Sequence, residues 1–191
     1  MSGQNERISD DEARARVLAA ADRLYYHLGV HAVGMDDLRA ESGVPLKRLY
    51  RLFPSKEAIV EQVLLNRRDM WHRLIEEAVS GDDPRQRLLA IYDALAQWFD
   101  QDDFRGCVFI NSFGELGTTA PRVAEIVREH KAGFQARLTE LVAEAGGPPP
   151  LAAHLAILAE GAQTTAAIAG TSDAAKQARQ AAEVLINAAI G

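Results

Sequence analysis

Breaks that contain glycine and proline divide this sequence into segments whose apolar residues recur at helical spacing. In the first segment, Val17, Ala21, Leu24 and Leu28 lie three or four residues apart, and Gly29 follows as a natural helix end. Alanine is abundant, especially after residue 150, whereas Val, Ile and Thr are not concentrated in short alternating runs. Because alanine favours helices and alternating β-branched residues favour strands, we expect an all-α fold.

Capping residues and breaks together predict nine helices. Ser9 and Glu12 have the spacing of a capping box, Ser55 suits an N-cap, and Asp83 precedes a proline at a first helical position. The expected helical segments are 9–28, 36–42, 45–52, 55–79, a segment from Pro84 that ends before Gln101, the glycine-bounded apolar segment 105–117, a segment from Thr119 and Pro121 to about Ala145, 151–169 and 173–190.

The distribution of charge matters more than the net charge of −6. Residues 1–60 carry nine Lys or Arg and nine Asp or Glu, whereas residues 61–191 carry twelve and eighteen. Within the neutral part, residues 44–56 contain four basic residues and no acidic one. A compact basic patch on an acidic protein is compatible with DNA binding.

Several features that mark other classes of protein are absent from the sequence. Residues 1–6 contain no basic region followed by an apolar run, so we expect no signal peptide. No stretch approaches ~18 uninterrupted apolar residues, so no membrane partner is expected. Cys107 is the single cysteine, which excludes a disulfide within the chain and fits a reducing cytoplasm. We therefore expect a cytoplasmic protein.

The sequence also contains little that indicates an enzyme or a metal site. The chain has no glycine-rich phosphate loop and no serine nucleophile elbow. His27 and His31 have a spacing that can bind metal on one helical face, but Gly29 between them should end the helix. We therefore expect no enzyme, no metal site and no cofactor.

The segments 36–42 and 45–52 form a pattern typical of a helix-turn-helix, because two short helices are joined by a turn that contains Gly43. Leu38, Val44, Leu49 and Phe53 are spaced to pack both helices against the first helix. The side chains that then face outward are Lys47, Arg48, Tyr50 and Arg51. Their donors can reach base edges in a major groove, and Lys56 can contact phosphate.

The run from Gly43 to Glu57 resembles the TetR family of bacterial repressors. It has Gly-Val, a few variable residues, Leu-Tyr, two positions ending in Phe, and then Ser-Lys-Glu. Met35-Asp36-Asp37-Leu38 and other upstream residues extend the resemblance to roughly residues 11–66. The resemblance implies a nine-helix TetR-like architecture with a three-helix DNA-binding domain.

The same resemblance implies roles for individual residues. Tyr50 is similar to the family tyrosine that contacts phosphate or a thymine methyl, and Lys56 to a lysine that binds phosphate. Leu46, Lys47 and Arg48 occupy the variable positions that read bases, and we expect Arg48 to contact guanine. Two positions depart from the family pattern: Arg48 stands where Ser or Thr is usual, and Leu52 where an aromatic residue or His is common. The operator sequence therefore does not follow by analogy.

The last two predicted helices, 151–169 and 173–190, are rich in alanine and carry larger residues such as Leu155 and Leu185. TetR-like proteins pack two such helices from each subunit into a four-helix interface. The resemblance thus implies a homodimer and a pseudo-palindromic DNA site whose half-sites lie ~34–36 Å apart. An internal core pair is the alternative interpretation.

Residues 85–117 carry many of the chain's aromatic side chains. The equivalent helices of TetR-like proteins line a ligand cavity, so we expect a hydrophobic or aromatic small-molecule effector, with plain core packing as the alternative. The candidate ligand-binding residues are Trp98, Phe99, Cys107, Phe109, Asn111 and Phe113. The run from Arg105 to Asn111, followed by Glu115-Leu116-Gly117, resembles a family subset in which some members sense electrophiles or oxidants through a cysteine. Arg105 could lower the pKa of the Cys107 thiol, but a buried core cysteine is the simpler interpretation.

These observations predict two domains, residues 9–56 for DNA binding and residues 57–191 for ligand binding and dimerisation. The predicted function is a ligand-responsive transcriptional repressor that binds its operator as a homodimer and is released by an effector. The alternatives are a cysteine-based electrophile or redox sensor, and a helical protein-binding adaptor that does not bind DNA.

Overall fold

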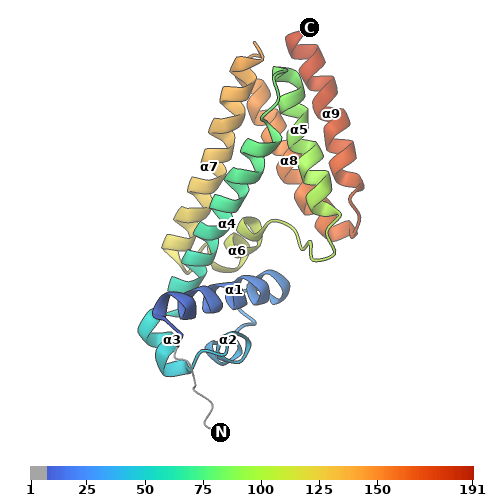
Figure 1. The fold of residues 1–191 in the computed structure, drawn as a ribbon. Coiled ribbons are helices and arrows are strands. Elements are labelled where there is room, and N and C mark those ends of the chain that lie inside the picture. The colour runs from blue at the N-terminus through green and yellow to red at the C-terminus, as the bar shows by residue number, and fades with distance from the viewer. Residues whose placement is uncertain (1–7) are drawn as a thin grey trace.

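The computed structural model describes residues 8–191, and within them the chain forms nine α-helices and no strand (Figure 1). Residues 1–6, for which we expect no signal peptide, lie outside the described residues. The helices are α1 (Asp10–Leu28), α2 (Met35–Ser42), α3 (Leu46–Leu52), α4 (Lys56–Ala78), α5 (Pro84–Phe99), α6 (Val108–Leu116), α7 (Pro121–Glu144), α8 (Pro150–Ala169) and α9 (Asp173–Ile190). None of these helices combines the length and apolarity needed to cross a bilayer. The all-α prediction is confirmed.

Local capping explains why the helices begin close to the predicted residues. The Ser9 hydroxyl accepts from the Glu12 amide at 3.1 Å, and the Ser55 hydroxyl accepts from the Ala58 amide at 3.2 Å. The Glu12 side chain does not complete the expected capping box, because its carboxylate pairs with Arg16 at 2.7 Å. The side chain of Asp83 caps α5, whose first residue is Pro84.

The helices form a small head and a larger body, and the body consists of α4 to α9 (Figure 1). The head consists of α1, α2 and α3, and α5, α8 and α9 pack together at the opposite end. The long helices α4 and α7 lie side by side and extend from the head side into the body. One hydrophobic cluster continues from the head into α4, α6 and the first half of α7, so residues on both sides of position 56 share a core.

The alanine-rich helices α8 and α9 pack mainly within their own protomer. Ala152, Ala159, Ala175 and Ala182 are fully buried among α5, α8 and α9. These small side chains therefore serve the internal core pair that the sequence left as an alternative. The same two helices still expose larger apolar side chains, at Ile157, Ile168 and Val184.

Candidate DNA interface and ligand cavity

The turn between α2 and α3 is built on Gly43. This residue ends α2 with φ of +68°, a left-handed conformation that side chains with a Cβ adopt at a cost. Leu38, Val44 and Leu49 around the turn are at most 1% exposed and anchor both helices in the head. The predicted helix-turn-helix is therefore present, and its packing fixes which face of α3 meets the solvent.

The free face of α3 presents Lys47, which is exposed, and Tyr50, which is 50% exposed. Leu46 lies partly exposed at the first position of α3, and Lys56 lies partly exposed at the first position of α4. A helix N-terminus attracts anions, so Lys56 and the N-terminal end of α4 together suit a phosphate group.

The two arginines of α3 are held by the start of α1. The Arg48 guanidinium lies 2.6 Å from the Asp10 carboxylate and also donates to the Ile8 carbonyl oxygen at 2.7 Å. Arg51 lies 2.7 Å from the same carboxylate oxygen. The Arg48 hydrogen bond, together with the charges of both arginines, lowers the pKa of Asp10. Arg48, expected to contact guanine, is thus mostly buried against α1, whereas Arg51 remains exposed.

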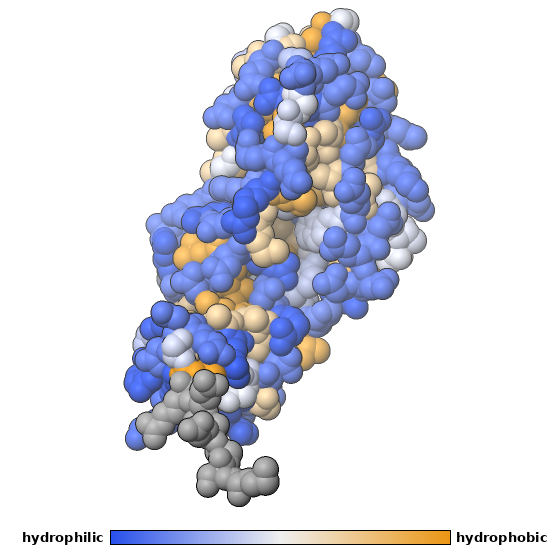
Figure 2. Space-filling model, viewed as in Figure 1, coloured by the Kyte–Doolittle hydropathy of each residue, from blue (hydrophilic) through white to orange (hydrophobic). Residues whose placement is uncertain are grey.

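A cavity of about 530 Å³ lies in the body, between α4, α5, α7 and α8, and next to the N-terminus of α6. The space-filling view shows a hollow on this face, with pale and orange residues among hydrophilic ones (Figure 2). The volume falls within the ~300–1,000 Å³ typical of small-molecule sites. The lining residues are Tyr26, Arg67, Met70, Trp71, Arg73, Leu74, Glu77, Ala94, Gln97, Trp98, Gln101, Cys107, Val108, Phe109, His130, Lys131, Phe134, Glu160 and Gln163.

Three of the six residues expected to bind ligand line this cavity: Trp98, Cys107 and Phe109. The other three lie elsewhere. Phe99 packs in the core with its ring centroid 4.7 Å from that of Phe104. The Asn111 side chain donates to the Arg105 carbonyl oxygen at 3.1 Å, and Phe113 is 42% exposed on α6.

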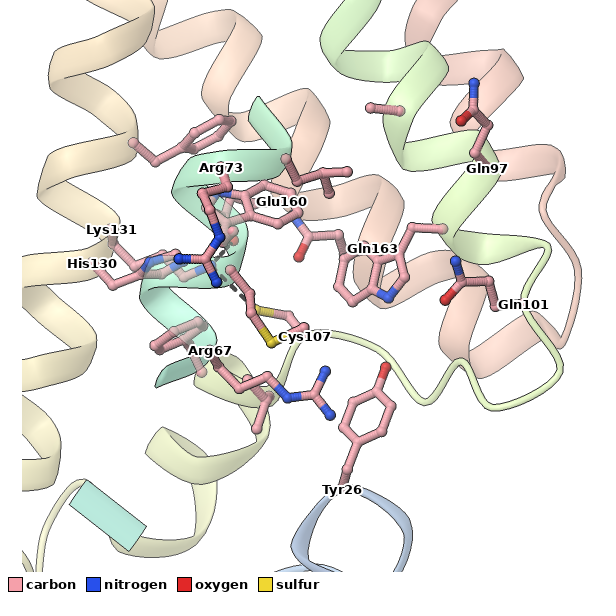
Figure 3. Close-up of a pocket in the computed structure, with 18 of the residues that line it drawn as sticks. Tyr26, Arg67, Arg73, Gln97, Gln101, Cys107, His130, Lys131, Glu160 and Gln163 are labelled. Atoms are coloured by element: carbon pink, nitrogen blue, oxygen red, sulfur yellow. Dashed lines mark hydrogen bonds and ion pairs between the residues drawn. The ribbon is translucent and has the colours of Figure 1, made fainter. Parts of the chain in front are cut away.

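Several polar lining residues were missed from the sequence, and they gather on α7 and α8 (Figure 3). The Lys131 ammonium lies 2.5 Å from the Glu160 carboxylate and 3.5 Å from the Cys107 sulfur. His130 is 3% exposed, and its ring stacks on Phe109 with centroids 3.6 Å apart. Burial lowers the pKa of His130 to about 3, so the imidazole is neutral at pH 7. The one signal for His130 in the sequence is a polar side chain at a helical position where a buried residue is expected.

The cavity reaches the head through Tyr26 of α1. The Tyr26 hydroxyl accepts from the Arg105 amide and donates to the Gly106 carbonyl oxygen, both at 2.9 Å. Arg67 of α4 lies over the Tyr26 ring at 4.8 Å and forms a two-pronged ion pair with Asp22 at 2.5 and 2.8 Å. Burial raises the pKa of Tyr26, so its hydroxyl stays protonated and can donate.

A second connection joins α6 to the loop after α1. The Glu115 carboxylate accepts from the backbone amides of Val30 at 3.0 Å and His31 at 2.7 Å. Gly29 permits this approach, because a Cβ at that position would lie 3.0 Å from a Glu115 carboxylate oxygen. The Glu115 side chain is therefore used in the junction between head and body.

Two family models match two separate parts of the chain. The model for bacterial regulatory proteins of the tetR family matches residues 17–63, which include the helix-turn-helix. The model for the tetracyclin repressor-like C-terminal domain matches residues 84–182, which include much of the cavity lining.

Similar individual proteins agree with these matches. The transcriptional activator FasR of Mycolicibacterium smegmatis is 31% identical over 128 residues, which is 65% of this chain and 56% of FasR. The transcriptional repressor NemR of Escherichia coli is 29% identical over 111 residues, or 56% of each protein. The alignments thus span about half of the length of these relatives.

A crystal structure of a TetR-family transcriptional regulator from Streptomyces coelicolor superimposes with a TM-score of 0.89. It is 26% identical in sequence, and the match covers 95% of this chain and 97% of that one. The helix-turn-helix, the all-α body and both family models lead to the same conclusion: the chain belongs to the TetR family of DNA-binding transcriptional regulators.

Proposed function

We propose that the protein is a ligand-responsive repressor that binds a pseudo-palindromic operator as a homodimer. The free face of α3 carries this proposal, because its exposed lysine and tyrosine stand on a helix whose opposite face is buried in the head. Of the two relatives described above, one is an activator and the other a repressor. Repression, rather than activation, is therefore part of the proposal.

Lys47 and Tyr50 are the residues that we assign first to the DNA, with Leu46 beside them at the start of α3. Lys56 is assigned to a phosphate near the N-terminus of α4. Arg51 joins the phosphate contacts when it leaves Asp10. Arg48 contacts a base only if its bonds to Asp10 and Ile8 break, which makes its contribution dependent on the position of α1.

An effector acts by favouring a dimer in which the two α3 helices no longer match successive grooves. The effector must bind the two states with different affinities, since equal affinities would shift no population. The coupling runs through α4, which supplies Arg67 and Trp71 to the cavity and begins beside α3. Tyr26 and Glu115 add two contacts by which the cavity side of the body holds α1.

Selection from a random duplex DNA library by the purified protein tests the DNA claim, followed by a salt titration on the enriched sequence. We expect an inverted repeat bound at nanomolar concentration, with log K falling by about 0.9 per phosphate contact for each unit of log salt. Lys47→Glu should abolish the enrichment, whereas Arg128→Glu, an equal change of charge on an exposed residue of α7, should leave it intact. If no sequence is enriched by the intact dimer, the adaptor function replaces this proposal.

The Lys131 ammonium 3.5 Å from the Cys107 sulfur favours a second candidate function, electrophile sensing. Lys131 donates a hydrogen bond to this sulfur, and the sulfur of a cysteine is the atom that electrophiles modify. Cys107 is 5% exposed and lines the cavity, so only electrophiles that enter the cavity should reach it.

N-ethylmaleimide provides the test of this second function. The Cys107 sulfur adds to one carbon of the maleimide double bond and loses its thiol proton, and the other carbon takes up a proton from water. If Cys107 is a sensor, intact mass spectrometry should show one adduct and the enriched operator should be released in parallel. Cys107→Ser should resist both changes. Modification without release would leave the cysteine reactive but not regulatory.

A further inference from the structure

The wall of the cavity contains an unusual share of the protein's buried polar side chains. Among residues 8–191, four polar or charged side chains are buried, and two of them, His130 and Gln163, line this cavity. His130 is 3% and Gln163 2% exposed. Buried polar groups normally find hydrogen-bond partners within the protein, so these two residues need an explanation.

Neither residue uses its full hydrogen-bonding capacity inside the protein. The Nδ1 atom of His130 is enclosed and has no partner, and Nε2, which is not fully enclosed, forms no hydrogen bond with the described residues. The Gln163 amide donates one hydrogen bond, from Nε2 to the Ala159 carbonyl oxygen at 3.2 Å, which leaves a second N–H and the side-chain carbonyl oxygen. A ligand that reaches Nε2 of His130, or the remaining N–H and carbonyl oxygen of Gln163, pairs these groups and gains affinity.

The charges in the inner part of the cavity are already balanced. Lys131 is neutralised by Glu160 at 2.5 Å, and Arg67 is neutralised by Asp22, also at 2.5 Å. His130 adds no charge, because burial keeps its imidazole neutral. The further charged lining residues, Arg73 and Glu77, form no ion pair among the described residues, and both are exposed residues of α4, outside this inner part. A charged ligand held beside His130 and Gln163 would lose hydration there, where the nearest cation, Lys131, already has a counter-charge.

Aromatic side chains form the apolar part of the wall. The ring centroids of Trp71 and Trp98 lie 5.6 Å apart at 60°, and those of Trp71 and Phe134 lie 5.9 Å apart at 71°. In Figure 3, His130 and Gln163 come from different helices and border the same space. The wall thus offers ring surfaces next to two uncharged hydrogen-bonding groups.

We propose that the cavity binds an uncharged aromatic molecule that carries a hydroxyl or carbonyl group, and that Gln163 and His130 hydrogen-bond that group. The inference rests on the proposed function only in assigning the cavity to an effector. From the sequence we expect a hydrophobic or aromatic effector. The inference is more specific, because it requires a polar group on that molecule and excludes a formal charge.

Four probes with one ring system test the proposal by equilibrium dialysis against the full-length protein. They are naphthalene, 2-naphthol, 2-naphthoate and 2-naphthylmethylammonium. We expect 2-naphthol to bind at least about tenfold more tightly than each of the other three. This ranking in the unmodified protein decides the claim about charge. If either ion binds as tightly as 2-naphthol, or if no probe binds, the proposal is overturned.

Variants then test the two named residues. Gln163→Leu and His130→Phe keep similar volumes and remove the polar groups, so each should reduce the preference for 2-naphthol over naphthalene. The double variant should abolish it. Gln86→Leu removes the same amide from an exposed residue of α5 that does not line the cavity and should leave the preference unchanged. A tenfold preference that survives in the double variant would contradict the assignment.

A DNA-binding measurement on the same preparations separates the two proposals. The ranking of probes is measured without DNA and can fail while operator binding stays intact. Operator binding can equally fail while the ranking holds, in which case the cavity inference stands and the regulatory function does not.

Discussion

At the scale of single residues, Asp10 controls the charge of the surface that we propose binds DNA. One of its carboxylate oxygens lies 2.6 Å from Arg48 and 2.7 Å from Arg51, so two cations of α3 share one anion. A phosphate must compete with this carboxylate for both arginines. Asp10 is itself about half exposed, which means that the competition takes place in solvent and is sensitive to salt.

Asp10→Ala should therefore tighten binding to non-operator DNA, because Arg51 becomes available to phosphate and Arg48 keeps only its hydrogen bond to the Ile8 carbonyl oxygen. In a fluorescence-anisotropy salt titration, the slope of log K against log salt should become steeper by about 1 to 2. Asp11→Ala removes an exposed neighbouring acid of the same helix turn and should change the slope by less. Equal effects of the two variants would mean that only the net charge matters.

The buried imidazole of His130 predicts that the free energy of unfolding depends on pH. Its pKa falls from 6.5 to about 3, first because of burial and then because of the charges of Lys131, His72 and Arg68. The unfolded chain therefore binds more protons than the folded protein between these values, and the free energy of unfolding rises with pH across this window. Stability is fully present above about pH 6.5 and is lost as the pH falls toward 3.

Urea unfolding at several pH values from 4 to 7 measures this linkage. His130→Phe should flatten the dependence, by up to about 1.4 kcal/mol for each pH unit. His154→Gln, at an exposed position of α8, should leave the slope of the wild-type protein unchanged. A His130→Phe slope equal to that of the wild type would show that this imidazole does not titrate differently in the two states.

At the scale of helices and turns, the same substitution should have opposite signs at two glycines. Gly43 has φ of +68° with open space around it, so Gly43→Ala meets no clash but forces a side chain into a left-handed conformation. We expect a loss of about 1 kcal/mol. Gly114 lies within α6, also in open space, and Gly114→Ala should gain about 0.5–1 kcal/mol. Chemical denaturation of both variants checks the pair, and a loss at both positions would contradict it.

Helix limits were predictable because their signals are local. Ser9, Ser55 and Asp83 cap helices as expected, and Gly29 ends α1 between His27 and His31. The three-helix head followed because its turn and its buried positions lie within one short stretch. The DNA-facing role of Arg48 could not be judged in this way, because Asp10, its partner, lies 38 residues away in the chain.

The cavity was predictable only in part, because residues from six separate helices line it. Trp98, Cys107 and Phe109 were selected as aromatic or reactive residues in one region, and they do line the cavity. Phe99 and Phe113 belong to the same region but turn to the core and to the surface. Periodicity assigns residues to a face, and it does not say which face encloses an empty space. Gln163 gave no signal because an isolated glutamine is usually exposed.

At the scale of the whole molecule, Glu115 joins the head to the body. Its carboxylate accepts two backbone amides from the loop after α1, and such hydrogen bonds to a charged group are worth ~1.5–3 kcal/mol. Glu115→Ala should therefore increase hydrogen exchange of the Val30 and His31 amides by about tenfold or more, and also that of α1 to a smaller extent. Exchange in α8 and α9 should not change.

Glu125→Ala serves as the control for this experiment, because Glu125 is an exposed residue of α7 that pairs with Arg122 at 2.5 Å. If the head is held by Glu115, only the first variant should affect α1. Increased exchange throughout the protein would instead indicate a general loss of stability.

The dimer provides the last prediction at this scale. Ile157, Ile168 and Val184 are 69%, 82% and 68% exposed on α8 and α9, although neighbouring alanines of these helices are buried in the protomer. Three large aliphatic side chains exposed on two adjacent helices suit a surface that a second copy covers. Ile168→Glu would place an unpaired charge in that interface, at a high desolvation cost. Sedimentation at micromolar concentration should then show monomers.

The loss of the dimer should carry over to DNA binding, because in the proposed function each protomer brings one α3 to one half-site. Binding to the full operator should weaken by about 100-fold or more when the two half-sites are no longer engaged together. Leu28→Glu is the matched control, since Leu28 is a 60% exposed leucine of α1 and lies outside α8 and α9. If Ile168→Glu remains dimeric, the interface lies elsewhere on the body. If it is monomeric and still binds the full operator tightly, one head suffices for recognition and the two-fold operator is not needed.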